Sequence, residues 1–299
     1  MEWRNIILRI SVVVTTYNGK MHLEKQLLSL LQQERAPDEV LIFDDGSTDG
    51  TIELVQSFIR KNCLESWQFY VNAKRKGWKQ NFMEGLRKAA GDILFPCDQD
   101  DIWYPKKLAE MTAVMEQHPE IKLLACDYRV LYEPGALKAT VYKKTPAETQ
   151  GLITRYGFTK HFFMNPYPGC TYAVRRDFFD AVKELWFDGS PHDEFLWLMA
   201  AVQDGAWFYN RVLMDYVRYS DNASGVRYKD VALQKENLRY IHKQLCALQS
   251  FAAEHPDAVP VERCKMLAAA QIWCAKRQKL METRSPLRWL ALAPWWGYY

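Results

Sequence analysis

The sequence predicts an α/β protein with a mostly parallel central sheet and helices on both faces of that sheet. Two observations indicate this fold class. Short runs of β-branched and other apolar residues recur through the first hundred residues, and amphipathic helical segments separate them. Strands that alternate with helices in this way form βαβ units, whose strands pair in parallel.

The predicted elements follow in order along the chain. The first strand is the β-branched run at residues 10–15, and continuous apolar character is typical of a strand buried on both faces. The next helix carries its apolar residues at positions i, i+4, i+7 and i+8, namely Leu23, Leu27, Leu30 and Leu31. The remaining elements of this half are strands at 39–43, 67–71 and 92–96 and helices at 51–60 and 78–90.

The second half is less regular. Residues 131–165 mix β-like and polar pieces, which we interpret as a loop region facing an acceptor. A turn, a short strand and a helix are predicted within 165–179, and an apolar helix within 191–205. From residue 226 the pattern is helical. We therefore predict a catalytic unit at 1–225 and a helical, basic and aromatic extension at 226–299.

Composition argues against several classes of protein. The net charge of +3 is too small to indicate nucleic-acid binding, although residues 226–299 hold 12 Lys and Arg against 6 Asp and Glu. The seven cysteines include no CxxC pair, so neither a disulfide framework nor a zinc site is expected. We find no cleavage-site pattern and no uncharged run of the roughly 18 residues that a membrane helix needs, so we expect a cytoplasmic protein.

Polar clusters follow three of the four strands predicted in the first half. Ligands of such sheets bind outside the carboxyl ends of the strands, so these clusters are expected to lie together. They comprise Thr15, Thr16, Tyr17 and Asn18 after the first strand, Asp44 and Asp45 after the second, and Asp98, Asp100 and Asp101 after the fourth. No glycine-rich dinucleotide or P-loop signature occurs at these turns, which argues against both of those nucleotide-binding folds.

The stretch FPCDQDDIWYPKKL, residues 95–108, places three carboxylates within four positions. Like charges this close raise one another's pKa unless a cation lies between them. Mg²⁺ or Mn²⁺ fits, because hard cations take carboxylate oxygens and often a substrate phosphate. A solvated acidic turn is the alternative. Asp44 and Asp45 can accept hydrogen bonds from a base or a ribose, so the two acidic clusters together suit a nucleotide diphosphate.

Four motifs in order make the chain resemble a known family. SVVVTTYNG, LIFDDGSTDGT, the Asn-Phe of KQNF and CDQDDIWYPKKL together resemble an inverting glycosyltransferase of family 2, which has a GT-A fold. The DQDDIW form and a later His-Asp pair most resemble its rhamnosyltransferase-like members. The resemblance covers roughly residues 10–225 and implies a Rossmann-like, mostly parallel sheet flanked by helices.

The resemblance implies a role for each matching position on the donor side. Thr15 and Tyr17 would line the nucleobase pocket, and Asp44 or Asp45 would read the base and ribose. Arg75 or Lys76 would meet the diphosphate, with a solvated basic loop as the alternative. Asp98 would touch the ribose or the metal, Asp100 would ligate the metal, and Asp101 would orient its neighbours or cap the helix beginning near Pro105.

On the acceptor side, the resemblance makes Asp193 the candidate general base. An inverting transferase needs one carboxylate to take the acceptor hydroxyl's proton, which contributes roughly 10²–10⁴-fold to the rate. Glu194 is the rival base, and a cap of the helix starting at 194 is the structural alternative for Asp193. Gly169 and Cys170 match a segment that closes the acceptor side of the sugar site, unless they only begin a buried strand.

The chain departs from the family at a late motif. Where the family often has a histidine that assists the metal or diphosphate, this sequence has Tyr219, and no other histidine is an obvious replacement. Metal binding is therefore expected to rest on the aspartates. Arg218 could supply positive charge to the diphosphate instead.

The basic, aromatic end of the chain, SPLRWLALAPWWGYY, has the residue mix favoured at a membrane interface. We predict a peripheral contact of this tail with the inner face of the cell membrane; packing on the body or on a second subunit is the alternative. The predicted partners are thus a nucleotide-diphosphate sugar, a glycan or lipid-linked acceptor and a membrane surface, without nucleic acid and with oligomerisation open.

The predicted function is transfer of a sugar, with inversion, from dTDP-rhamnose or a UDP-hexose to a hydroxyl of a growing surface polysaccharide or lipid-linked glycan. Nucleotidyl or phosphoryl transfer could use the same aspartates but would bring a P-loop or more basic residues. A catalytically silent sugar-binding or scaffolding component of a polysaccharide assembly complex is the non-enzyme alternative.

Overall fold

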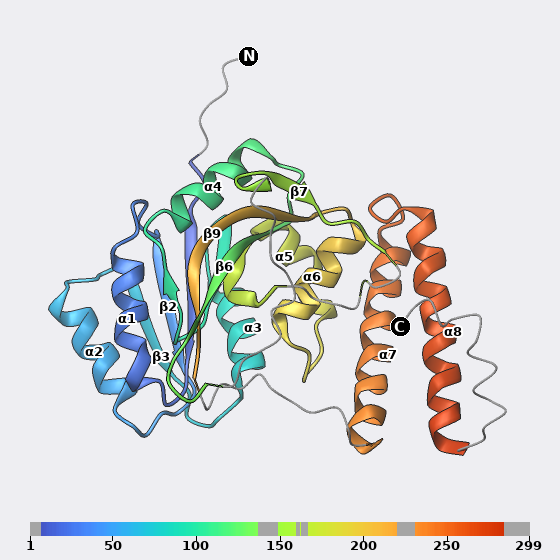
Figure 1. The fold of residues 1–299 in the computed structure, drawn as a ribbon, viewed down its shortest axis with the longest axis horizontal. Coiled ribbons are helices and arrows are strands. Elements are labelled where there is room, and N and C mark those ends of the chain that lie inside the picture. The colour runs from blue at the N-terminus through green and yellow to red at the C-terminus, as the bar shows by residue number, and fades with distance from the viewer. Residues whose placement is uncertain (1–6, 137–148, 160–161, 163–166, 220–230, 284–299) are drawn as a thin grey trace, which may run out of the picture.

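The computed structural model describes residues 7–136, 149–159, 162, 167–219 and 231–283 (Figure 1). The predicted boundary at residue 225 and the aromatic tail from 284 onward lie outside the described residues. Those two predictions stay predictions.

The first half contains every strand and helix predicted for it. The order is β1 (Ile10–Thr16), α1 (Lys20–Leu31), β2 (Glu39–Asp44), α2 (Thr51–Lys61), β3 (Trp67–Val71), α3 (Trp78–Lys88) and β4 (Ile93–Cys97). The helix predicted to reach residue 90 ends two residues earlier. Ala89 there has an extended backbone, which stops the helix.

The second half is more fragmented. It runs through β5 (Ile102–Trp103), α4 (Lys107–Gln117), β6 (Leu123–Tyr132), β7 (Ile153–Arg155), η2 (Gly169–Thr171), β8 (Tyr172–Arg175), α5 (Arg176–Val182), η3 (Lys183–Leu185), α6 (His192–Val202), β9 (Ala206–Arg218), α7 (Val231–Glu254) and α8 (Val261–Thr283). The predicted helical character after residue 226 is confirmed by α7 and α8.

In the described part of the chain these strands form one nine-stranded sheet, ordered β3-β2-β1-β4-β8-β6-β9-β5, with β7 also paired to β9. β3, β2, β1 and β4 are parallel, as predicted. The other half is mixed. β8 runs antiparallel to both its neighbours, β6 and β9 are parallel, and β5 and β7 are antiparallel to β9.

Helices cover both faces of the sheet (Figure 1), and alternate residues of β1 belong to the two cores beneath them. Val12 and Val14 of β1 belong to the core under α1, α2 and α4, whereas Val13 belongs to the core under α3, α5 and α6. This explains the unbroken apolar run of β1, because both faces of the strand are buried.

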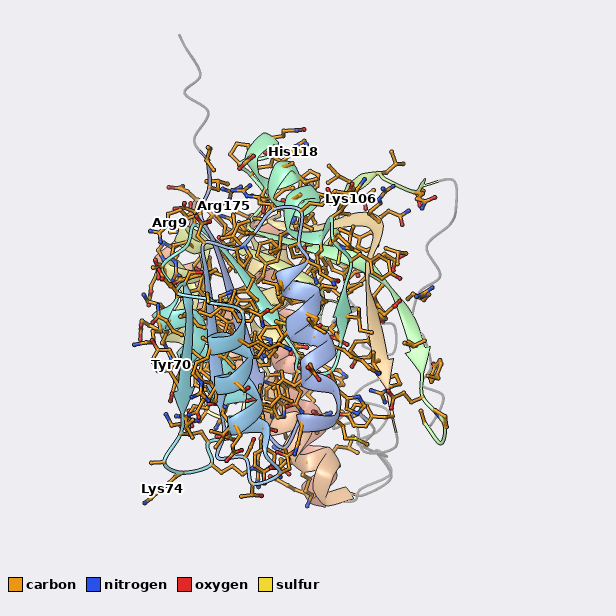
Figure 2. The ribbon with its side chains drawn as sticks, turned by 90° about the vertical axis from the view of Figure 1, so that its left-hand side faces the viewer. Arg9, Tyr70, Lys74, Lys106, His118 and Arg175 are labelled. Atoms are coloured by element: carbon orange, nitrogen blue, oxygen red, sulfur yellow. The ribbon has the colours of Figure 1, made fainter. Side chains whose placement is uncertain are left out.

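The carboxyl ends of the parallel strands lie at one end of the molecule. Figure 2 shows Arg9, just before β1, and Lys74, just after β3, at opposite ends of the sheet. The polar clusters that follow β1, β2 and β4 therefore share the end marked by Lys74. Ligands of such sheets bind there.

α7 and α8 pair with each other beside α6 and extend its core (Figure 1). Leu238, Leu245 and Leu248 of α7 and Leu267 and Trp273 of α8 are buried in the same hydrophobic cluster as the apolar side of α6. Among the described residues, no helix combines the length and apolar character needed to cross a membrane.

Gly85 of α3 allows the helix to lie directly on the sheet. A Cβ atom at this position would come within 2.4 Å of Val13 Cγ1 and 3.1 Å of Phe43 Cε2. In helices, alanine is favoured over glycine by about 1 kcal/mol, but overpacking of a core costs roughly 1–3 kcal/mol. Gly85→Ala is therefore expected to lower the free energy of unfolding by about 1 kcal/mol, measured by urea denaturation.

Gly157→Ala is the matched control for Gly85→Ala, since no atom lies within 4 Å of its added Cβ and the residue does not have a left-handed backbone. It should leave the unfolding midpoint near that of the native chain. Equal or greater stability of Gly85→Ala would show that α3 moves off the sheet without cost.

Candidate active site

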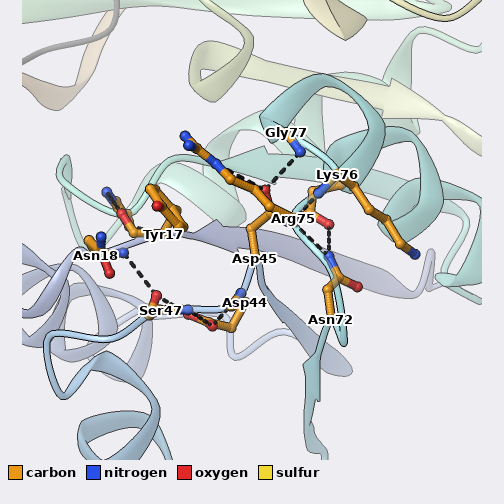
Figure 3. Close-up of polar contacts among 12 residues, drawn as sticks. Tyr17, Asn18, Asp44, Asp45, Ser47, Asn72, Arg75, Lys76 and Gly77 are labelled. Atoms are coloured by element: carbon orange, nitrogen blue, oxygen red, sulfur yellow. Dashed lines mark hydrogen bonds and ion pairs between the residues drawn. The ribbon is translucent and has the colours of Figure 1, made fainter.

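Asp44 is buried at the end of β2 and organises the loop that follows (Figure 3). Its Oδ1 accepts hydrogen bonds from the backbone N–H groups of Gly46 (3.0 Å) and Ser47 (2.7 Å), and its Oδ2 accepts them from the hydroxyls of Thr16 (2.8 Å) and Ser47 (2.5 Å). Both oxygens thus bind groups of β1 and of its own loop. Asp44 fixes the shape of the pocket wall.

Asp45, the next residue, holds a second loop. Its carboxylate accepts hydrogen bonds from the N–H groups of Lys76 and Gly77 (2.7 Å each) and from Asn72 Nδ2 (3.0 Å), and Arg75 Nε lies 4.0 Å away (Figure 3). These contacts bring the predicted donor-binding residues Asp45 and Arg75 together. Of the two rivals for the diphosphate, Lys76 instead bonds Glu84 through its Nζ at 2.6 Å.

Tyr17 and Arg75 form a flat surface beside Asp45. The Arg75 guanidinium carbon lies 4.0 Å from the centre of the Tyr17 ring, and Tyr17 N donates to Gln99 Oε1 at 2.9 Å. An aromatic ring and a guanidinium plane both stack well on flat π systems. Thr15, predicted to line the same pocket, is buried.

Asp98 and Asp101 come together at the end of β4, next to Cys170. One carboxylate oxygen of each aspartate and the Cys170 Sγ lie within 4.8 Å of one another. Asp101 Oδ1 accepts a hydrogen bond from Val217 N, whereas Oδ2 is buried without an N–H or O–H donor among the described residues. Asp101 does not cap α4, because that helix starts at Lys107 with no side-chain cap.

These two carboxylates fit a hard divalent cation. Burial and the charge of Asp100 raise the pKa of Asp98 to about 7, and burial with the charge of Asp98 raises the pKa of Asp101 well above its usual range. A bound cation would remove both penalties and supply the missing partner of Asp101 Oδ2. Burial also raises the pKa of the Cys170 thiol, so this sulfur stays neutral and is a poor ligand for Mg²⁺ or Mn²⁺.

Asp100 points to a different set of partners. Tyr219 donates its hydroxyl to Asp100 Oδ2 at 2.7 Å. Burial raises the pKa of this carboxyl, and the hydrogen bond from Tyr219 and the charge of Arg218 offset part of that rise. The His22 ring stacks on Tyr219 with 4.4 Å between ring centroids. His22, from α1, was not singled out from the sequence, although it stands beside the residue that replaces the family's histidine.

Asp193 lies in the first turn of α6, against η2. The N-cap of α6 is Pro191, so Asp193 does not cap the helix; its Oδ1 accepts from the Glu194 N–H at 2.9 Å. A Cβ added at Gly169 would approach Asp193 Cβ to 3.1 Å and His192 Nε2 to 2.4 Å. Burial and the charge of Glu194 raise the pKa of Asp193 to about 6, which suits a general base near neutral pH.

η2 connects the two acidic groups. Gly169 packs against Asp193, and the next residue, Cys170, packs against Asp98 and Asp101. The charge of Asp193 is close enough to raise the pKa of Asp98 further. The metal-type carboxylates and the candidate base thus lie next to consecutive residues of one buried three-residue segment.

Lys107 is a buried charge that the sequence analysis did not single out. Its Nζ donates to the Cys170 carbonyl at 2.5 Å and lies 3.8 Å from the centre of the Trp103 ring. Its positive charge offsets part of the burial penalty of Asp98. Lys107 therefore holds η2 through the Cys170 carbonyl and places a buried positive charge near Asp98.

The family model described as Glycosyl transferase family 2 matches residues 11–179, more than half of the chain. The chain belongs to this family. One relative is the dTDP-rhamnosyl transferase RfbG of Shigella flexneri. It is 24% identical over 228 residues, which cover 71% of this chain and 73% of RfbG. Another is the poly(ribitol-phosphate) β-N-acetylglucosaminyltransferase TarS of Staphylococcus aureus, 30% identical over 155 residues, or 51% of this chain and 26% of TarS.

Solved structures of other glycosyltransferases have the same fold. The crystal structure of TarS residues 1–349 with UDP-GlcNAc matches with a TM-score of 0.62 and 17% identity, over 92% of this chain and 81% of that one. The mannosyltransferase PcManGT from Pyrobaculum calidifontis, in complex with GDP-Man and Mn²⁺, gives 0.53 and 17% over 96% and 79%. The predicted GT-A fold of this family 2 member is confirmed.

Proposed function

We propose that this family 2 glycosyltransferase moves a sugar, with inversion, from dTDP-rhamnose or a UDP-hexose to a hydroxyl of a surface polysaccharide or lipid-linked glycan. One observation carries the proposal: η2 places the candidate base Asp193 next to the paired carboxylates Asp98 and Asp101. The similarity to RfbG, a dTDP-rhamnosyl transferase, supports the first donor, and the similarity to TarS supports a UDP-linked one.

The nucleotide would occupy the carboxyl ends of β1 and β2. Its base would stack on Tyr17 and Arg75, and Asp45 would accept hydrogen bonds from the base or ribose after exchanging contacts with the 72–77 loop. Asp44 would hold the pocket wall, since the described donors to its carboxylate belong to β1 and to its own loop. Arg218, beside Asp100, would add positive charge near the diphosphate.

Mn²⁺ or Mg²⁺ would be held by Asp98, with Asp101 Oδ2 or Asp100 as the second carboxylate. When bound, the cation supplies charge stabilisation to the departing diphosphate. Asp193 would accept the proton of the acceptor hydroxyl while that oxygen attacks the anomeric carbon. Its raised pKa makes it a stronger proton acceptor than an ordinary aspartate, and it remains ionised at neutral pH.

Glu194 is a weaker candidate for the base. Its Oε2 accepts the hydroxyl of Tyr240 of α7 at 2.7 Å, so this carboxylate already has a strong donor from another element. Gly169 and Cys170 would close the acceptor side of the sugar site. The non-enzyme alternative, a sugar-binding scaffold, is tested by the same donor-binding experiment.

Nucleotide binding tests the proposal first. We expect dTDP or UDP, but not GDP or CMP, to raise the thermal unfolding midpoint in a concentration-dependent way, and only with Mn²⁺ or Mg²⁺ present. Ligand at 100 times its Kd stabilises the folded state by about 2.7 kcal/mol, which is readily measured. If the nucleotide still raises the unfolding midpoint in EDTA, the aspartates do not bind a metal that nucleotide binding needs. If no nucleotide raises the midpoint, the sugar-binding scaffold is favoured.

A further inference from the structure

The C-terminal helix α7 contacts the start of α6 through a buried polar network. Tyr240 donates its hydroxyl to Glu194 Oε2 at 2.7 Å and accepts a hydrogen bond from Gln244 Nε2 at 2.6 Å. The same Gln244 nitrogen lies 3.0 Å from the hydroxyl of Ser190. Ser190 is 0% exposed and Gln244 is 1% exposed, so water cannot replace these contacts.

The loop that leads into α6 is held on both sides of this network. Trp186 Nε1 donates to the Ser190 carbonyl at 3.0 Å, and Lys79 Nζ of α3 donates to the Gly189 carbonyl at 2.6 Å. The ring of Phe187 packs against Tyr240, with 5.9 Å between centroids. The residues just before Asp193 are therefore fixed by α3 on one side and α7 on the other.

Asp193 and Glu194 are adjacent but meet different elements. Asp193 lies against Gly169 of η2, whereas Glu194 is bonded to Tyr240 of α7. The Tyr240 hydroxyl stays protonated over the working pH range, because burial and the charge of Glu194 raise its pKa. It is therefore a permanent donor to Glu194.

We propose, resting on the function proposed above, that Tyr240 is a positioning residue for sugar transfer. Its hydroxyl holds the Glu194 carboxylate on α7 and so keeps the first turn of α6 in the orientation that presents Asp193 to the acceptor. α7 thus supports the acceptor site. Without the hydroxyl, Glu194 is released beside Asp193 and competes with it for the acceptor proton.

Tyr240→Phe tests this inference, because it removes one oxygen and keeps the ring that packs on Phe187. The readout is release of nucleoside diphosphate from dTDP-rhamnose, and in parallel from UDP-GlcNAc, with water as acceptor. We expect kcat to fall by roughly tenfold or more, since misplacement by about 1 Å can cost about 100-fold. The KM for the donor should stay near that of the native chain. The unfolding midpoint is expected to fall somewhat, because the buried Gln244 loses a hydrogen-bond partner, but the variant should remain folded at the assay temperature.

A double-mutant cycle shows whether Tyr240 acts through Glu194. In a Glu194→Gln background, Tyr240→Phe is expected to cause much less further loss than it does in the native chain. The matched control is Tyr209→Phe, which removes another tyrosine–glutamate hydrogen bond, 2.9 Å to Glu110 Oε2, away from α6. It should leave kcat unchanged.

Three outcomes would overturn the inference alone: native kcat in Tyr240→Phe, losses that add fully in the double variant, or a fall in kcat matched by Tyr209→Phe. A native chain that binds nucleotide-sugar and releases nucleoside diphosphate is the reference for all three. If the native chain neither binds nor turns over any donor, the proposed function fails, and this inference fails with it.

Discussion

Asp193→Asn is expected to abolish sugar transfer while leaving donor binding intact. The amide has nearly the same shape as the carboxylate, but it cannot accept the proton of the acceptor hydroxyl. The loss in kcat should be roughly 10²–10⁴-fold, the contribution of a positioned general base. The nucleotide-dependent rise in unfolding midpoint should match that of the native chain, because none of the donor contacts proposed above involves Asp193.

The pKa of Asp193 adds two pH-dependent readouts. Since burial and Glu194 raise this pKa to about 6, kcat of the native chain should fall as the pH drops below about 6 and the base becomes protonated. A pKa raised above the unfolded value means that folding favours the protonated acid. The protonated Asp193 carboxyl therefore adds to the free energy of unfolding at low pH, and this contribution is lost as the pH rises through about 6.

Asp193→Asn should therefore be at least as stable as the native chain at neutral pH, as measured by urea denaturation. Asp257→Asn, an exposed carboxylate between α7 and α8, is the control and should change neither activity nor stability. If Asp193→Asn does not fold, Asp193 is required for the structure and the variant gives no support for a role as the base. Retained turnover would point to Glu194 as the base.

Asp98→Asn is expected to remove metal-dependent nucleotide binding. Asp98 shares the carboxylate cluster at the end of β4, and its pKa is raised to about 7 because burial and neighbouring charges disfavour its ionised form. Replacing it removes a charged ligand. The apparent Kd for Mn²⁺ should rise at least about 100-fold, given that loss of outer partners alone costs roughly 10–100-fold.

Calorimetric titration of Mn²⁺ in the presence of the bound nucleotide measures this change. Asp100→Asn and Asp101→Asn, made in parallel, identify the second ligand. We expect the greater loss for Asp101, because its Oδ2 has no N–H or O–H donor among the described residues, while Asp100 is bonded to Tyr219. Asp188→Asn, an exposed carboxylate before α6, is the control. Native Mn²⁺ affinity in Asp98→Asn would rule out a metal role for this cluster.

Local sequence patterns were sufficient for the first half of the fold. β1 to β4, α2 and α3 were predicted within two residues of their bounds, and α1 was predicted from its leucine stripe, because each strand is an apolar run and each helix has an apolar stripe. The motifs around Asp44 and Asp98 were equally local. They identified the family that the family model then showed.

Contacts between distant segments could not be predicted in this way. The antiparallel placement of β8 between β4 and β6 depends on long-range pairing, which leaves no periodic signal in β8 itself. The burial of Lys107 is similar, since a lysine before an apolar helix is usually a solvated residue. Its role emerges only where η2 supplies a carbonyl and β5 supplies the Trp103 ring.

The sequence alone indicated the chemistry available to this protein: parallel strands that end in carboxylates, and a later aspartate that we propose as the base. Only the tertiary structure decided how those groups are used. It bonded Asp100 to Tyr219 and Glu194 to Tyr240 of α7, and it left Asp101 Oδ2 with no N–H or O–H donor in the described part of the chain. Residue type and the local spacing of apolar residues determine which helices and strands form. The partners of a buried polar atom depend instead on which distant segments of the chain pack beside it.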